Sequence, residues 1–468
     1  MMTVFLTIVI LISGYLLGSL ILKNISSIGR FGLSIGLGML IFSIIPFIQL
    51  LFGIALSRNS VYLLIVLVLL ILGVLNYTRK SISGRSKKLD FPDSSIFLKD
   101  EGKYFFMLMI VVGVVLIFIT LYFPISAWDA LTLYDFRGEV LSRGLLLKDL
   151  QSLDSFDRYN EGYYFAYPMS TSLIHALYYL VGSNSPQIIY PLIFFSLVIF
   201  FYYLMSHYVS RRLSLSLSLI LVTSNVLFQH ATMPYTNLPY AYFYFVSTAL
   251  LVVYILEKKD LGLLITSALF LAGSSWMRFA EPFYLINILI LMFFCFRKQV
   301  SVVSMILYSL PVLILRGLWG ITLRIYAPNT FLNNIDYSLL LKSLFSLPVD
   351  SLKLALSAYI GFVNQNALLF SIFLVSAVLF VLKGNYKDWS PEKIYLLIVF
   401  SDFLIILAGT FIIGIVLPGR SEVYDSLGRF GLFLFPLIIF AAGLILKDQF
   451  KFRIRSGQAR SDEINERS

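Results

Sequence analysis

Apolar stretches of about 17 to 25 residues recur from one end of the 468-residue chain to the other. Each is long enough for a helix to cross about 30 Å of hydrocarbon. Apolar residues make up 59% of the chain and charged residues only 13%, which is more apolar than a soluble domain can solvate. The sequence therefore predicts an all-α polytopic membrane protein with little room for a soluble domain.

Thirteen of these stretches are predicted to cross the membrane. They are 3–21, 30–54, 60–76, 104–125, 187–206, 213–230, 238–256, 261–276, 282–296, 300–320, 354–382, 393–417 and 429–447. A further apolar run, 163–182, holds several hydroxyl side chains, and we predict that it forms an interfacial or partly inserted helix. If it crossed as well, the basic pair Lys258-Lys259 would lie outside, against the positive-inside rule.

The distribution of basic residues predicts the orientation. The linker from Tyr77 to Lys103 carries seven Lys and Arg residues against four acidic ones, which places it in the cytoplasm. The segment 126–162 has seven acidic residues against four basic ones and is predicted to face outward. The N-terminus then lies outside and the C-terminus inside a plasma membrane, and we expect residues 3–21 to be a retained span and not a signal peptide.

Several classes of function are excluded by composition. The net charge of +11 comes from Lys and Arg in short loops between spans, where membrane orientation explains it, so we predict no nucleic-acid role. Cys295 is the only cysteine, which excludes an intramolecular disulfide and a cysteine-based metal site. No phosphate-cradling glycine loop is present, which argues against a soluble nucleotide donor.

The outward segment 126–162 opens with acidic residues at the membrane edge. We predict an amphipathic helix in which Leu131, Tyr134, Val140 and Leu141 lie on lipid while Asp129, Asp135 and Glu139 face water. Asp129 can act there as a general base for an acceptor hydroxyl, or hold a divalent cation beside a lipid phosphate. The alternative interpretation is a solvated acidic face without chemistry.

Two arginines are predicted at the same outer edge. Arg278 and Glu281 are three residues apart and are predicted to face one another on one helix side, either as a structural ion pair or as part of a substrate path. Arg429 opens the last span and can bind phosphate bidentately or simply extend to the interface. We predict that His175 is a helix-packing residue and not a base.

Taken in order, these short motifs resemble the GT-C superfamily of membrane glycosyltransferases, in its protein-mannosyltransferase-like and aminoarabinose-transferase-like branches. The series runs from about residue 103 to 447 and comprises Trp128-Asp129, Tyr167-Pro168, Asn237-Leu238-Pro239, Arg278 with Glu281, and Arg429-Phe430. In that family the first outward loop carries an acidic residue, often Asp-Glu, that is a catalytic base or metal ligand. Two positions depart from the pattern, because Ala130 follows Asp129 and Asn237 stands where the family has an aspartate.

The resemblance implies a transferase that takes a sugar from a polyprenyl-phosphate donor and moves it, with inversion, to an envelope glycan, lipid or protein. It implies Asp129 as the catalytic residue, with a divalent cation as an optional cofactor. The residues implied in substrate binding are Asp135, Glu139, Tyr167, Asn237, Arg278, Glu281 and Arg429.

The chain is expected to divide into a three-helix extension with a basic linker (1–102), a GT-C-like catalytic domain (103–447) and a basic cytoplasmic tail (448–468). A transporter or flippase of lipid-linked sugars is the main alternative, because intramembrane charges can also line a translocation path. A polysaccharide polymerase or ligase is a second alternative, which a large late outward loop would favour. The segment 325–350 is of only moderate size for such a loop.

Overall fold

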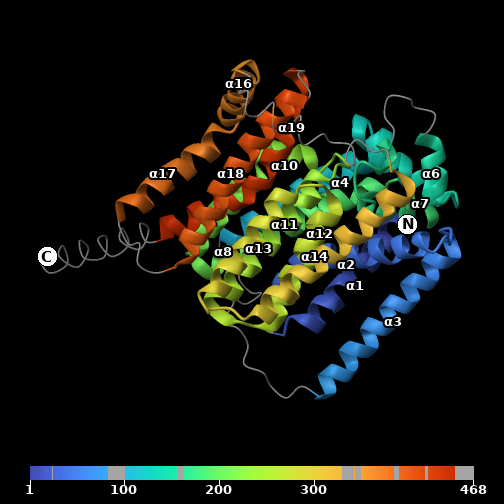
Figure 1. The fold of residues 1–468 in the computed structure, drawn as a ribbon. Helices are drawn as coiled ribbons and strands as arrows, with labels where there is room; N and C mark the ends of the chain where they lie inside the picture. Colours follow the sequence, from blue (N-terminus) through green and yellow to red (C-terminus); the bar gives the residue numbers. More distant parts are fainter. Residues whose placement is uncertain are drawn as a thin grey trace, which may run out of the picture.

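The computed structural model describes residues 1–23, 25–82, 101–154, 162–328, 342, 349–383, 389–416 and 420–447, and within these ranges the regular secondary structure is helical throughout. Figure 1 shows the helices gathered side by side, with α3 at one edge. The all-α prediction is therefore confirmed for this part of the chain. The predicted tail and the linker residues 83–100 lie outside the described residues.

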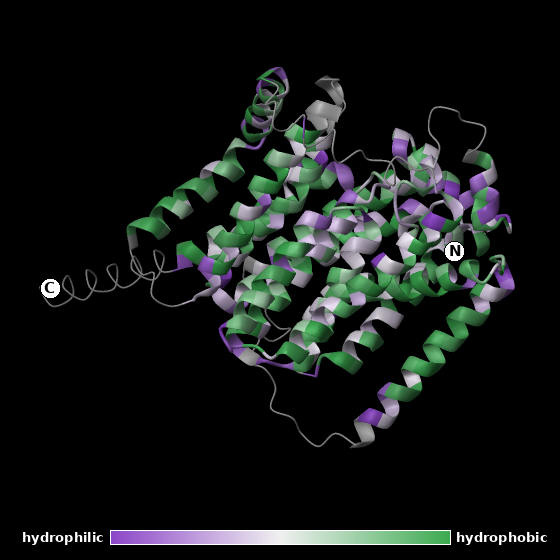
Figure 2. Cartoon of the chain, in the orientation of Figure 1, coloured by the Kyte–Doolittle hydropathy of each residue, from purple (hydrophilic) through white to green (hydrophobic). Residues whose placement is uncertain are grey.

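Nine helical segments of the described ranges are long and apolar enough to cross a membrane. They are α1 (Met2–Ile21), α2 (Ser27–Leu51), α3 (Arg58–Ile82), α4 (Glu101–Tyr122), η4 with α8 (Pro186–Tyr208), α11 with most of η5 (Asn237–Glu257), α14 (Val302–Tyr326), α18 (Pro391–Val416) and the run Ser426–Lys447. Hydrophobic residues cover the lengths of the helices and hydrophilic ones gather near their ends (Figure 2). The chain is a multi-pass membrane protein, as predicted.

The span predicted over 354–382 is not one continuous helix. The structure has two helices there, α16 (Val349–Gln365) and α17 (Ala367–Lys383), bent by 92° at Asn366. The Asn366 side chain donates a hydrogen bond of 2.9 Å to the carbonyl of Phe362, which ends α16. If this bent pair is one span, the described ranges hold ten.

The predicted span 213–230 is also divided. α9 (Arg211–Val222) ends after twelve residues, and α10 (Asn225–His230) begins after a short turn. In that turn the hydroxyl of Thr223 bonds the carbonyl of Leu219 at 2.8 Å. Hydroxyl residues at the turn thus interrupt the helix that the apolar pattern predicts.

Two further predicted spans form helices that are apolar but short. α12 (Leu261–Met277) has 17 residues and α13 (Glu281–Phe296) has 16. At 1.5 Å per residue each is about 25 Å long, somewhat less than the hydrocarbon thickness. The total of thirteen crossings therefore stays a prediction.

The first acidic loop folds into short helices, as predicted, but they pack into the protein. Its elements are η2 (Ala130–Asp135), α5 (Phe136–Ser142) and α6 (Leu147–Asp154), and they are followed in the chain by η3 (Tyr163–Phe165) and α7 (Ser170–Leu180). Tyr134, Val140 and Leu141 are buried and only Leu131 is exposed, so the predicted lipid-facing side is wrong. The reason is that α5 packs closely on α7, where a Cβ at Gly138 would lie 2.7 Å from the Cβ of His175.

The run 163–182, predicted to be interfacial, is mostly the helix α7. This helix has only 11 residues, which is too few for a span. Ten of the eleven are buried, and α7 packs against α2 and α5. It is therefore enclosed by other helices, and its position relative to the membrane stays a prediction.

α11 is the central helix of the bundle. All 17 of its residues are buried, and it packs against α8 and α12. α2 packs against α7 and α8, so the first two helices belong to the same core as the rest. α1 approaches α2 through glycine, since a Cβ at Gly14 would lie 1.7 Å from the Ser34 carbonyl oxygen.

Candidate functional site

The predicted site residues come from helix ends that meet at one end of the bundle. Asn237 begins α11, Arg278 follows the last residue of α12, and Glu281 begins α13. Because these consecutive helices alternate in direction, their site-bearing ends lie together. Arg429 is contributed by α19 (Arg420–Gly431), and Asp129 directly precedes η2.

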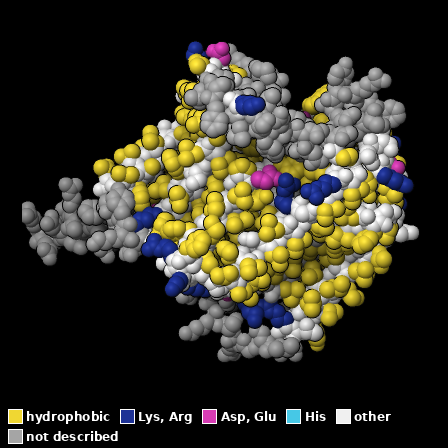
Figure 3. Space-filling view, in the orientation of Figure 1, with side chains coloured by type: hydrophobic (Ala, Val, Ile, Leu, Met, Phe, Trp, Pro, Cys, Tyr) yellow, Lys and Arg dark blue, Asp and Glu magenta, His cyan; other side chains and the backbone are white. Residues whose placement is uncertain are grey.

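Basic residues occupy the opposite ends of these helices. Lys259 lies between α11 and α12, while Arg297 and Lys298 follow α13. Figure 3 shows Lys and Arg side chains along the lower left edge of a largely hydrophobic face and others beside acidic side chains near its middle. The candidate site and this basic end are thus about a helix length apart, roughly 25 Å. Which end faces the cytoplasm stays a prediction.

Asp129 and Arg429 form an ion pair although they are 300 residues apart in sequence. Arg429 Nη1 donates to Asp129 Oδ2, and both side chains are about a quarter exposed, at 21% and 26%. The ring of Tyr235 lies 4.9 Å from the Arg429 guanidinium carbon. The two residues predicted to act on a phosphate and on an acceptor hydroxyl are therefore in contact.

Arg278 is buried, with only 6% of its surface exposed. Its guanidinium lies between two aromatic rings, 4.8 Å from Phe430 and 5.3 Å from Tyr167. Nη1 donates to Asn237 Oδ1, whereas Nε has no hydrogen-bond partner. No carboxylate of the described residues pairs with it. A buried guanidinium without a counter-charge is a strong attractor for an anion.

Asn237 is held in one orientation by His230. The Nδ1 atom of His230 bonds the Val226 carbonyl at 3.0 Å, so that nitrogen carries the proton. Its Nε2 atom can then accept from Asn237 Nδ2, at 3.3 Å, which leaves Asn237 Oδ1 for Arg278. Asn237 thus orients Arg278 without neutralising its charge.

The predicted contact between Arg278 and Glu281 is wrong. Glu281 pairs with Arg316 of α14, whose guanidinium lies 4.4 Å from the ring of Phe279. The reason is local backbone, because Arg278 is extended at φ −155° and ψ 151° and helical spacing does not apply between the two residues. The sequence analysis missed Arg316, although an arginine inside the apolar run 300–320 is itself a signal of function.

Tyrosines from the first loop and from the loop before α11 line the site. Tyr134 contacts Tyr167 and Tyr235 with ring centroids 5.9 and 6.4 Å apart. The Tyr134 hydroxyl lies 3.2 Å from that of Thr236. Burial raises the pKa of Tyr134, so the phenol stays neutral. These rings connect the Asp129–Arg429 pair to Arg278.

The other two predicted acidic residues contact protein groups elsewhere. Asp135 is buried, and its Oδ1 accepts hydrogen bonds from His175 at 2.8 Å and Tyr179 at 2.7 Å. Glu139 pairs with Arg143 one turn later, at the surface. The prediction that Asp135 faces water is wrong, while the packing role predicted for His175 agrees with its complete burial.

Arg137 is a buried residue that the sequence analysis did not select. Its Nε donates to Ser172 Oγ at 2.9 Å, and Nη1 donates to the carbonyls of Tyr164 and Tyr167 at 3.0 and 2.8 Å. Nη2 donates to the Pro168 carbonyl at 3.4 Å. Arg137 thus fixes the loop that presents the Tyr167 ring to Arg278.

No group of three His, Cys, Asp or Glu side chains that could hold a metal ion is found among the described residues. The residue predicted as a ligand for a divalent cation, Asp129, contacts the Arg429 guanidinium. A cationic neighbour disfavours a divalent cation at the same carboxylate. Arg429 and the other described residues around Asp129 therefore do not fit that cofactor.

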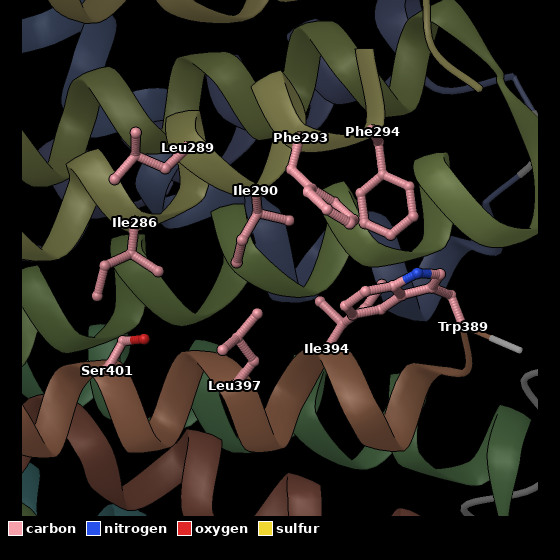
Figure 4. Close-up of a pocket in the computed structure, with 9 residues that line it drawn as sticks. All are labelled: Ile286, Leu289, Ile290, Phe293, Phe294, Trp389, Ile394, Leu397 and Ser401. Carbon is pink, nitrogen blue, oxygen red and sulfur yellow. The ribbon is translucent and has the colours of Figure 1, made fainter. Parts of the chain in front are cut away.

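An apolar groove of about 230 Å³ lies between α13 and α18. Figure 4 shows α13 side chains such as Ile286 and Phe293 facing Leu397 of α18, with Ser401 at one end and Trp389 at the other. Ile286 follows Glu281 by five residues on the same helix. The groove therefore begins about 7 Å along α13 from the charged residues.

Comparisons of the chain with protein-family models, with curated proteins and with solved structures found no match. Its function is therefore argued from its own residues.

Proposed function

We propose that the protein is a glycosyltransferase that takes a sugar from a polyprenyl-phosphate donor and passes it to a glycan, lipid or protein acceptor. The observation that carries this proposal is Arg278, a buried guanidinium with an unpartnered Nε and no carboxylate beside it. An anionic phosphate supplies the missing charge, and guanidinium binds phosphate through two parallel hydrogen bonds.

A lipid-linked donor is supported by the apolar groove between α13 and α18. It starts on the helix that carries Glu281 and is lined almost entirely by hydrophobic side chains (Figure 4). A polyprenyl phosphate has two parts that this arrangement can hold: the phosphate at Arg278 and the prenyl chain in apolar surroundings. A free sugar nucleotide has no use for such a groove.

Asp129 is the proposed base. The carboxylate removes the proton of the acceptor hydroxyl, the hydroxyl oxygen attacks the anomeric carbon, and the bond from that carbon to the phosphate oxygen breaks with its electron pair. The donor phosphodiester carries one negative charge and the released polyprenyl phosphate carries two. Arg278 and Arg429 stabilise the additional charge as it develops.

The wider expectations belong to the same proposal. A GT-C-like arrangement and inversion at the anomeric carbon follow from the resemblance, whereas thirteen spans and a site facing outward from a plasma membrane follow from the apolar stretches and the basic loops. The meeting of Asp129, Arg278 and Arg429 at one end of the bundle, away from the basic end, supports a site at one membrane face.

The test is transfer of radiolabelled sugar from synthetic polyprenyl-phosphate donors by the purified protein. Asp129→Asn is expected to lower transfer at least about 1,000-fold, because an amide cannot accept the proton. Glu139→Gln is the matched control, since it removes a carboxylate of the same loop that pairs only at the surface. Transfer at wild-type rate by Asp129→Asn would exclude this residue as the base.

A transporter or flippase of lipid-linked sugars is the second candidate, and one observation favours it. The 92° bend between α16 and α17 is a broken helix of the kind that transporters use. In proteoliposomes a flippase moves a labelled lipid-linked sugar between leaflets with the sugar still attached. Translocation without any sugar transfer, over a broad acceptor panel, would replace the transferase proposal.

A further inference from the structure

The site holds three arginines and two carboxylates, and each carboxylate pairs with one arginine. Arg316 is paired with Glu281 and Arg429 with Asp129, whereas Arg278 has no acidic partner among the described residues. The described group thus has one positive charge in excess. Asp129 is therefore both the proposed base and the counter-charge of an arginine next to the anion site.

From this geometry we infer that Asp129 and the donor phosphate compete for Arg429, so that donor binding releases the base. The inference deepens the proposed function and rests on it, because the competing anion is the phosphate of the polyprenyl donor.

The contacts of Arg429 favour the exchange. Asp129 takes the Nη1 atom, and the Tyr235 ring lies over the guanidinium at 4.9 Å. The next residue, Phe430, packs on Arg278, so a phosphate held by Arg278 lies near Arg429. If Asp129 kept its place, its carboxylate would lie beside the phosphate, and two neighbouring anions repel each other strongly in low dielectric.

This exchange sets the order of donor binding, proton transfer and product release. Without donor, Asp129 Oδ2 is bonded to Arg429 Nη1, so this oxygen is not available to an acceptor hydroxyl. When the phosphate takes Arg429, the carboxylate becomes available to the acceptor hydroxyl. After it accepts the proton Asp129 is neutral and cannot compete for Arg429, so the product phosphate stays bound. Loss of that proton to water restores the carboxylate, which displaces the product.

The test is the affinity of the full-length, detergent-purified protein for farnesyl phosphate, measured by isothermal titration calorimetry. Asp129→Asn removes the competing charge and keeps the shape, and it is expected to bind the probe about tenfold more tightly than wild type. Asp129→Ala is the second variant, in case the amide itself bonds Arg429. Glu139→Gln, the matched control for a general loss of negative charge, is expected to stay within about twofold of wild type.

Unchanged or weaker affinity in both Asp129 variants would overturn the inference, as would tighter binding of the same size in Glu139→Gln. The outcome is separate from that of the proposed function. Tighter binding in the Asp129 variants together with no transfer from any donor would reject the transferase and keep the competition. Active transfer by the wild type with no gain in affinity in the Asp129 variants would keep the transferase proposal and reject the competition.

Discussion

Arg137 and Arg278 are both buried arginines near the same tyrosines, yet they are satisfied in opposite ways. Every nitrogen of the Arg137 guanidinium donates to a carbonyl or hydroxyl of the loop 164–172. Arg278 donates to Asn237, has an unpartnered Nε, and otherwise faces aromatic rings. All the guanidinium nitrogens of Arg137 are bonded within the protein, whereas Arg278 keeps a hydrogen-bond donor that can bind a ligand.

The same contrast separates two aspartates six residues apart. Asp135 is bonded by His175 and Tyr179 within the protein core. Asp129 is partly exposed and bonded to a single, partly exposed arginine from the end of the chain. We therefore expect the number of fixed protein partners to distinguish a structural polar residue from a functional one better than its charge or its position in sequence does.

Of the two buried arginines, Arg278 is expected to have the larger effect on anion affinity. Arg278→Met should lower the affinity for farnesyl phosphate about 100-fold, because the charge-assisted hydrogen bonds to phosphate are lost. Thermal stability should be kept or raised, since a buried unpaired charge is removed and the aromatic packing remains. Calorimetry and thermal unfolding in detergent measure the two quantities.

A large loss of stability in Arg278→Met with unchanged anion affinity would show that Arg278, like Arg137, has a structural role and does not bind the anion. Arg278→Lys is the matched variant that keeps the charge and loses the bidentate geometry. It is expected to fall between wild type and Arg278→Met in affinity.

Arg137→Met should show the opposite pattern. The substitution leaves three carbonyls and a buried hydroxyl without their donor, so the free energy of unfolding should fall by about 3 kcal/mol. The affinity of the remaining folded protein for farnesyl phosphate should change less than about threefold. A variant of normal stability that no longer binds the anion would place Arg137 in the site.

Much of the fold could be predicted because lipid imposes a simple rule on the sequence. Long apolar runs become helices, and the nine described spans match predicted ones. The rule fails at the α16–α17 bend and after α9, where the side chains of Asn366 and Thr223 add hydrogen bonds to carbonyls of the preceding turn. Average hydropathy does not register a single residue that ends a helix.

The site was predicted in part. The resemblance brought Asp129, Asn237, Arg278 and Arg429 together, and all four meet in the structure. Their pairing could not be predicted, because it depends on contacts between residues far apart in sequence. Glu281 is the clearest example, since its partner Arg316 lies on the next helix and local spacing pointed to Arg278.

The smallest effect is expected for Asp135→Asn, which makes the same chemical change as Asp129→Asn six residues away. The amide oxygen of asparagine can still accept from Tyr179 or His175, so about 1 kcal/mol of unfolding free energy should be lost. Sugar transfer should remain within about threefold of wild type, because these partners fix η2 against α7 and do not touch the arginines. Asp135→Leu, which leaves both donors unpaired, should cost more stability and still retain transfer. If Asp135→Asn lost transfer as completely as Asp129→Asn while staying folded, the number of protein partners would not separate structural from functional aspartates in this loop.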